Sequence, residues 1–128
     1  MVINGSVING SQTISAEASS KLELGPYTAV AFSEGVLSRC DDTLLPMGIT
    51  ITETDDEVQA GDDVHIQIKD ISVWRTGGAF AMGDALASDA AGRAVKATEG
   101  KFILGFALEE SVGENQLAKV QITKSGKM

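Results

Sequence analysis

Gly48-Ile49-Thr50-Ile51 and Gly105-Phe106-Ala107-Leu108 are two apolar segments, each led by a glycine, that lie fifty-seven residues apart. A further glycine stands thirteen residues before each segment, at Gly35 in the first case and at Gly92 in the second. Self-similarity at a fixed offset marks one supersecondary structure per copy. The sequence therefore predicts one compact β domain built from two related β units.

The residues that follow each glycine-led segment repeat as well. Acids and turn-forming residues fill 53–61 in the first copy and 109–115 in the second. Each copy then closes on an alternating stretch, 64–68 or 120–123, at an offset of fifty-six residues. Alternation of apolar and polar residues is the pattern of a half-buried strand. We expect Val64 and Val120 to occupy equivalent positions.

Several more short apolar stretches are bounded by glycine or by acids and predict strands. Short strands at spacings of about eight to twelve residues are typical of barrels and sandwiches. We therefore predict an all-β fold, a small barrel or sandwich of short antiparallel strands, in a single β domain over 15–128 of the 128 residues. The additional predicted strands are Tyr27–Phe32, Val36–Cys40, Ile71–Trp74, Ala85–Ala87 and Ala94–Thr98.

The N-terminus carries a tandem pentapeptide, Val-Ile-Asn-Gly-Ser, at 2–6 and again at 7–11. Asn-Gly is a strong turn signal, but two residues of strand cannot hold a hairpin in water. We expect residues 1–14 to form a flexible arm, either a frayed terminus or a segment that adds a strand to a neighbouring sheet. The candidate contact residues are Val2, Ile3, Val7, Ile8 and Ile14. Ser15–Lys21 is compatible with a helical turn or with a surface loop.

The formal net charge of −8, with acids in doublets such as Asp41-Asp42, argues against nucleic acid as a partner because phosphate attracts Lys and Arg. Apolar runs are too short to span a bilayer, and no signal peptide is recognised, so no membrane partner is expected. The single cysteine, Cys40, excludes an internal disulfide framework and suits a reducing compartment. We expect a soluble intracellular product, or part of an assembly that is built inside a cell.

Reactive residues are few. His65 is the only histidine, and it alternates with apolar residues in a predicted strand. We expect a solvent-exposed strand residue and not a catalytic base. One histidine and one cysteine do not make a zinc site. Gly77-Gly78 lacks the Lys-Ser/Thr step of a phosphate-binding loop. The sequence predicts no catalytic residue, no cofactor and no metal site, so we expect a protein that is not an enzyme.

Trp74 is the only tryptophan, and it precedes Arg75. Its expected role is core packing, because buried aromatic residues dominate small cores. The alternative is an anchor at a subunit interface, where Trp and Arg are enriched. Trp74 and Arg75 therefore join the candidate contact residues.

The second half of the chain resembles the small phage capsid decoration, or cement, proteins, a family also known as DUF2190. The motifs concerned are Gly-Asp-Ala-Leu at 83–86, Gly-Arg-Ala-Val at 92–95, Gly-Phe-Ala-Leu at 105–108 and Val-Gln-Ile at 120–122. The earlier half is compatible, so the resemblance covers 27–123. This family usually has alanine or isoleucine where Phe106 follows its glycine.

The resemblance implies a structural virion protein and no catalysis. Such proteins sit on the outer surface of a bacteriophage head, bridge and stabilise major capsid subunits, and frequently form trimers. It implies the major capsid protein as partner, a homotrimer, a place on the outer capsid surface and assembly in the host cytoplasm. Two alternatives remain open, another virion component (a head-fibre base or a tail-tube subunit) and a small β-barrel ligand-binding domain.

Overall fold

The computed structural model describes residues 13–17, 22–23, 27–33, 36–51, 57–58 and 63–128. All regular structure in these residues is β-strand, as the sequence predicts. No helix in this part of the chain is long and apolar enough to cross a membrane.

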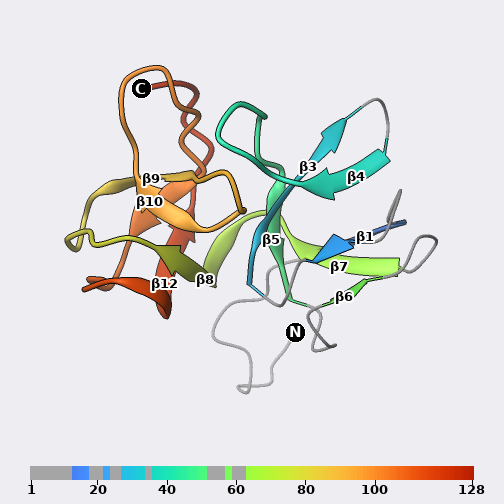
Figure 1. The fold of residues 1–128 in the computed structure, drawn as a ribbon, viewed down its shortest axis with the longest axis horizontal. Coiled ribbons are helices and arrows are strands. Elements are labelled where there is room, and N and C mark those ends of the chain that lie inside the picture. The colour runs from blue at the N-terminus through green and yellow to red at the C-terminus, as the bar shows by residue number, and fades with distance from the viewer. Residues whose placement is uncertain (1–12, 18–21, 24–26, 34–35, 52–56, 59–62) are drawn as a thin grey trace.

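The strands form two main bodies that lie side by side (Figure 1). One is a five-stranded sheet of order β1-β7-β5-β3-β4, and the other is a closed barrel of order β10-β8-β12-β11-β9. A small third sheet pairs β2 (Leu22–Glu23) with β6 (Glu57–Val58). The five-stranded sheet contains β1 (Thr13–Glu17), β3 (Ala29–Ser33), β4 (Val36–Arg39), β5 (Gly48–Thr50) and β7 (Asp63–Gln67). The barrel contains β8 (Asp70–Gly77), β9 (Ala85–Ser88), β10 (Ala94–Lys96), β11 (Gly105–Ala107) and β12 (Glu114–Ile122).

The two bodies share one topology. In the sheet, β7 pairs with β1 and β5, β5 with β3, and β3 with β4. In the barrel, β12 pairs with β8 and β11, β11 with β9, and β9 with β10, in the same order and all antiparallel. One parallel pairing, Ala94 with Thr76, closes the barrel between β10 and β8. The prediction of two related β units is confirmed, and this parallel pair is the exception to the antiparallel expectation.

The ladder registers fix which residues of the two units are equivalent. Ile49 pairs with Gln67 in the sheet, and Phe106 pairs with Gln121 in the barrel. Gln67 therefore corresponds to Gln121, and the equivalent of Val120 is Ile66. The expectation that Val64 would correspond to Val120 was wrong by two residues. A two-residue shift keeps every side chain on its own face of a strand, so the predicted faces were right.

The glycines that lead β5 and β11 serve one steric purpose. A Cβ at Gly48 would lie 2.4 Å from the carbonyl oxygen of Gln67, and a Cβ at Gly105 would lie 2.2 Å from that of Gln121. Real Cβ atoms do not approach backbone oxygens so closely, and only glycine allows this approach of two strands. The repeat of these two glycines therefore reflects a close approach of paired strands that both units share.

One hydrophobic cluster extends from the sheet into the barrel. Ala29, Ala31 and Ile49 of the sheet belong to the same buried cluster as Trp74 and Leu86 of the barrel. The turn at Gly92, between β9 and β10, reaches the sheet, where its carbonyl accepts the N–H of Ala29 at 2.8 Å. The two units therefore share one hydrophobic core.

One local expectation needs correction. Ser15–Glu17 lie in β1, paired with β7, so they form neither a helical turn nor a surface loop, while residues 18–21 lie outside the described part. Strand β1 gains its partner from β7, nearly fifty residues later, which local sequence does not reveal. The C-terminal residues are tied down by main-chain bonds, such as Met128 N to Lys101 O at 2.9 Å.

Candidate functional site

The single thiol is placed for packing and not for reaction. Cys40 is fully buried, and its Sγ donates to the carbonyl oxygens of Asp41 at 3.3 Å and Leu44 at 3.6 Å. Burial raises the pKa of the Cys40 thiol from 9.0 to about 11, with a smaller contribution from the charge of Asp41. A reactive cysteine needs a lowered pKa and exposure, and Cys40 has neither.

The only histidine, His65, lies at an exposed position of a strand. His65 is exposed in β7, where the ladder places it opposite Ser15 of β1. Among the described residues, no group of three or more His, Cys, Asp or Glu side chains is placed to hold a metal ion.

Four of the predicted contact residues, Val2, Ile3, Val7 and Ile8, lie outside the described part of the chain. Ile14 lies within β1 and pairs with Ile66. Strand β1 begins at Thr13, so the last two residues assigned to the arm belong to a sheet. The arm that remains to be tested is therefore 1–12.

Trp74 is a core residue. Its side chain is fully buried inside the barrel, and its indole N–H donates to the carbonyl of Gly92 at 2.9 Å. A side chain with no exposed surface has nothing to offer a partner, so Trp74 leaves the set of contact residues. Its packing role was the one that its residue type favoured.

Arg75, the next residue of β8, lies on the opposite face of the strand from Trp74. It is half-buried on the outside of the barrel, where it pairs with the exposed Leu117 of β12. Its backbone N–H donates to the carbonyl of Tyr27 at 2.8 Å, so Tyr27 lies along the edge of β8. Tyr27 has a positive φ of 64°, a conformation that non-glycine residues adopt only with support from their surroundings. Arg75 thus stays a surface candidate while Trp74 does not.

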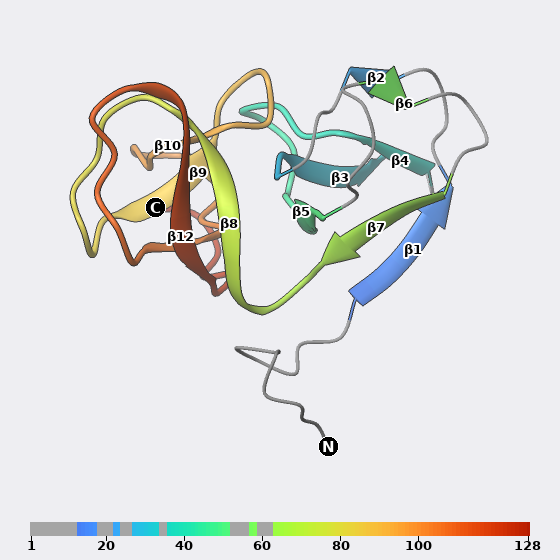
Figure 2. The same cartoon turned by 90° about the horizontal axis from the view of Figure 1, so that it is seen from below.

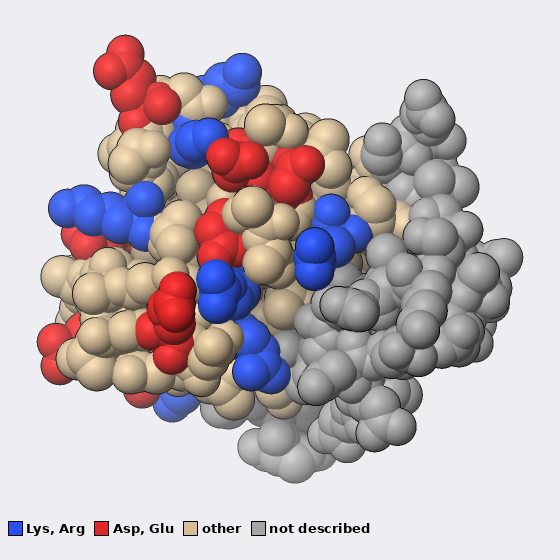
Figure 3. All heavy atoms as spheres, in the orientation of Figure 1, with Lys and Arg blue, Asp and Glu red and all other residues tan. Residues whose placement is uncertain are grey.

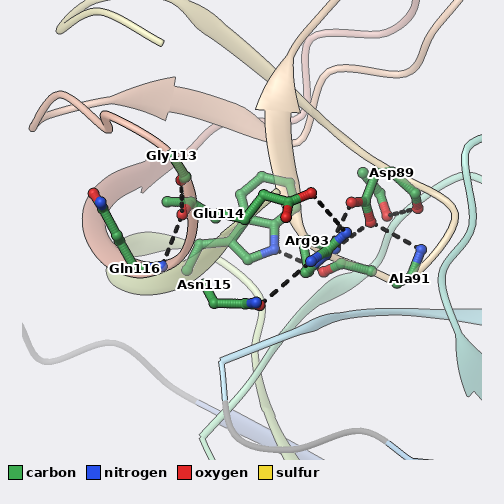
Figure 4. Close-up of polar contacts among 11 residues, drawn as sticks. Asp89, Ala91, Arg93, Gly113, Glu114, Asn115 and Gln116 are labelled. Atoms are coloured by element: carbon green, nitrogen blue, oxygen red, sulfur yellow. Dashed lines mark hydrogen bonds and ion pairs between the residues drawn. The ribbon is translucent and has the colours of Figure 1, made fainter. Parts of the chain in front are cut away.

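The most connected polar cluster of the barrel is centred on Arg93, between Asp89 on one side and Glu114 and Asn115 on the other (Figure 4). The Asp89 carboxylate accepts the N–H groups of Ala91 and Arg93, both at 2.8 Å, and the Arg93 Nε–H at 3.0 Å. The guanidinium also lies 3.8 Å from Glu114 Oε1. The Asp89 carboxylate thus holds the turn that carries Gly92, and the hydrogen bond from Ala29 N–H to the Gly92 carbonyl connects this turn with the sheet.

Sequence reasoning missed two exposed apolar side chains on neighbouring loops of the barrel. Met82 is 70% exposed and Val112 is 75% exposed. They lie on two loops, 78–84 and 108–113, that run alongside each other, joined by paired bonds between Phe80 and Ser111 at 3.0 and 3.1 Å. Both residues stand beside glycines, Gly83 and Gly113, and that was the only local signal of a projecting position.

Charge does not collect on the side of the molecule drawn in Figure 3, where positive and negative side chains are interspersed. One ion pair, Lys101 to Asp42 at 3.0 Å, connects the loop after β10 with the loop after β4. Exposed pairs of this kind contribute little to stability.

The fold and the exposed residues define a small all-β protein of two related units, whose described part offers surfaces for contact. The family model of phage cement proteins matches residues 14–122, and the chain belongs to this family. It is thereby a structural component of the bacteriophage virion. The predicted resemblance is confirmed.

A solved structure with a similar fold is the N base of head fiber gp8.5 in bacteriophage phi29. The likeness has a TM-score of 0.69 and covers 91% of this chain and 98% of that chain, at 24% identity. At this identity the likeness concerns the fold. No curated protein matches the chain.

Proposed function

We propose that this chain is a cement protein that binds the outer surface of a phage head and stabilises the shell by bridging neighbouring major capsid subunits. The observation that carries the proposal is the family match over residues 14–122, which includes both β units. A chain with two related units in a single body has two sides from which to contact two subunits. It acts as a homotrimer, after assembly in the host cytoplasm, and catalyses no reaction.

The residues support a passive role. The thiol of Cys40 is buried with a raised pKa, and the Asp89 carboxylate accepts the N–H groups of the turn that it holds. The exposed apolar side chains, in contrast, have no role in the fold that the described residues reveal. The tandem pentapeptide of the arm supplies further β-prone residues for strand addition to a capsid subunit.

The test is binding to phage heads that lack this protein. Purified protein is mixed with such heads, sedimented and quantified, and the heads are then heated to measure their stability. Saturable co-sedimentation together with a raised disruption temperature is the expected result. Absence of co-sedimentation with expanded heads would refute the proposal.

A second candidate is the base of a head fibre, and the fold likeness to the phi29 fiber base favours it. The two functions differ in copy number, since a cement protein covers the shell at many equivalent positions. Binding stoichiometry per head, measured by quantitative gel analysis of saturated heads, separates them. A tail-tube subunit predicts a six-membered ring instead, which light scattering detects.

A further inference from the structure

We propose that the outer face of three barrel strands binds the loop end of the barrel in a second copy of this chain, so that copies join head to tail in a closed ring. The inference rests on the homo-oligomer of the proposed function and names its two surfaces. The first surface, called the ribbon face, comprises Val73, Arg75, Phe106, Leu108, Leu117 and Lys119. The second, called the loop end, comprises Met82, Glu109, Glu110 and Val112.

The ribbon face follows from the register of β8, β12 and β11. Leu117 pairs with Arg75 and Lys119 with Val73, and directly opposed residues share one face of a sheet. Leu108 joins the same row as Lys119, since its N–H donates to the Lys119 carbonyl at 2.9 Å. Ala118 and Val120 alternate with these residues and are buried inside the barrel, so the ribbon face lies outside. Figure 2 looks onto this side, with β8 and β12 in front.

The chemistry of the ribbon face differs from that of the whole chain. It is apolar, with Leu117 52% and Leu108 36% exposed, and its charges are the cations Arg75 and Lys119. The net charge of the chain is −8. The carboxylate of Glu109 lies at the rim, where its Oε1 accepts the N–H of Lys119 at 2.7 Å. An apolar centre with cations suits a partner surface that is apolar and acidic.

The other unit is an internal control for this face. By register, Leu117 and Lys119 correspond to Asp63 and His65 of β7, and Val73 corresponds to Ser15 of β1. The same architecture therefore accepts acidic and polar residues at these positions. Leucine and valine in the barrel are not demanded by the fold, and contact with a partner accounts for them.

The loop end has the complementary character. Met82 and Val112 are its most exposed apolar side chains, and Glu109 and Glu110 are exposed carboxylates on the same loops. The loops are held in place, because Ser111 Oγ donates to the Gly78 carbonyl at 2.9 Å and Gly83 N–H donates to the Ala107 carbonyl at 2.8 Å. A surface that is already ordered loses little conformational entropy on binding.

Two different, complementary surfaces on one chain make a heterologous contact, which closes into a ring when the rotation permits. The ribbon face and the loop end adjoin where Leu108 meets Glu109. Surfaces on opposite sides of a subunit generate large rings or filaments, whereas adjoining surfaces enclose a wide wedge and generate small rings. The arrangement therefore favours a ring of few copies, in keeping with a trimer.

The test uses one variant on each surface, Lys119→Glu on the ribbon face and Val112→Asp on the loop end. Wild-type protein is expected to be oligomeric by light scattering, and each variant alone to associate about tenfold or more weakly, because like charges or a buried carboxylate oppose contact. Each variant keeps one intact surface, so a mixture of the two is expected to form a one-to-one dimer and nothing larger. Circular dichroism and thermal unfolding check that both variants fold.

Lys96→Glu is the matched control, since Lys96 is an exposed lysine on β10 outside both surfaces, and it is expected to assemble like the wild type. A monomeric wild type, single variants that still assemble, or a mixture that stays monomeric would each overturn the inference. Co-sedimentation with heads separates this from the proposed function. A wild type that is monomeric yet binds heads refutes only the ring, and one that assembles but ignores heads refutes only the attachment. Lys119→Glu protein that assembles but no longer binds heads would assign the ribbon face to the shell instead.

Discussion

The indole N–H of Trp74 in β8 donates to the carbonyl oxygen of Gly92 at 2.9 Å, in the turn between β9 and β10. The same oxygen accepts the N–H of Ala29, in β3 of the other unit, at 2.8 Å. One carbonyl group therefore connects both units, inside the region where Trp74 is fully buried. This relationship explains why the tryptophan is part of the core and unavailable to a partner.

Trp74→Phe keeps an aromatic ring but removes the indole donor. We expect a loss of about 1–3 kcal/mol in the free energy of unfolding, because a buried hydrogen bond and some packing are lost. Urea unfolding followed by circular dichroism measures it. Binding to heads, at temperatures where the variant stays folded, is expected to be unchanged. Weaker binding by a fully folded variant would return Trp74 to the contact surface.

Gly48→Ala and Gly105→Ala test the close approach of paired strands that both units share. The new Cβ would lie 2.4 Å from the Gln67 oxygen in the first variant and 2.2 Å from the Gln121 oxygen in the second. We expect both variants to lose about 1–3 kcal/mol or more of stability, since backbone must shift. Gly78→Ala is the control, because its Cβ would meet nothing nearer than 3.9 Å. Similar stability of all three variants would contradict the steric account.

The thiol of Cys40 predicts a dependence of stability on alkaline pH. Its pKa is raised from 9.0 to about 11 in the folded chain, so the folded state holds the proton more tightly than the unfolded state. The resulting stability is fully present below pH 9 and is lost as the pH rises towards 11. We expect the stability difference between the wild type and Cys40→Ala to fall by about 2–3 kcal/mol across this window.

Unfolding experiments on both proteins at several pH values isolate this effect, because other groups that titrate at high pH are common to both. A difference that stays constant from pH 8 to pH 11 would show that the thiol ionises without cost in the folded state.

Asp89→Ala is expected to destabilise the junction of the two units. The Asp89 carboxylate accepts backbone N–H groups of Ala91 and Arg93 and the side chain of Arg93. Hydrogen bonds to a charged group contribute more than neutral ones, so we expect a loss of about 1.5–3 kcal/mol. Asp42→Ala removes an exposed ion pair with Lys101 and is expected to cost less than about 1 kcal/mol. Thermal unfolding of the two variants side by side makes the comparison.

Deletion of residues 2–12 tests the arm without touching β1, which begins at Thr13. We expect the unfolding temperature to change little and the affinity for heads to fall about tenfold or more, since one of several linked contacts is lost. Co-sedimentation at a series of protein concentrations gives the affinity. Equal affinity with and without the segment would leave the arm with no part in attachment.

The sequence revealed the duplicated architecture because the constraint that creates it is local. Positions 48 and 105 require glycine because a paired strand approaches the backbone closely there. The alternation of buried and exposed residues in β12 shows directly which face of this strand points into the barrel. The pairing partners were harder. The pattern of β7 is equally compatible with registers two residues apart, which is why Ile66 and not Val64 is the equivalent of Val120.

The candidate surfaces were less predictable, because burial depends on contacts between distant residues. Trp74 and Arg75 are neighbours in sequence and lie on opposite sides of one strand, and only the closure of the barrel decides which of them is enclosed. Met82 and Val112 project because loops thirty residues apart run together, and no local motif encodes that. Ile14 looked like part of a free arm because its partner, Ile66, is remote.

The two units are copies of one topology fused in a single polypeptide, and fusion has an evolutionary consequence. A half-length ancestor that paired with itself would have carried each substitution on both halves at once. In this protein one unit carries Asp63 and His65 where the other carries Leu117 and Lys119. Asymmetry of that sort lets a small protein specialise its halves, which a pair of identical chains cannot do.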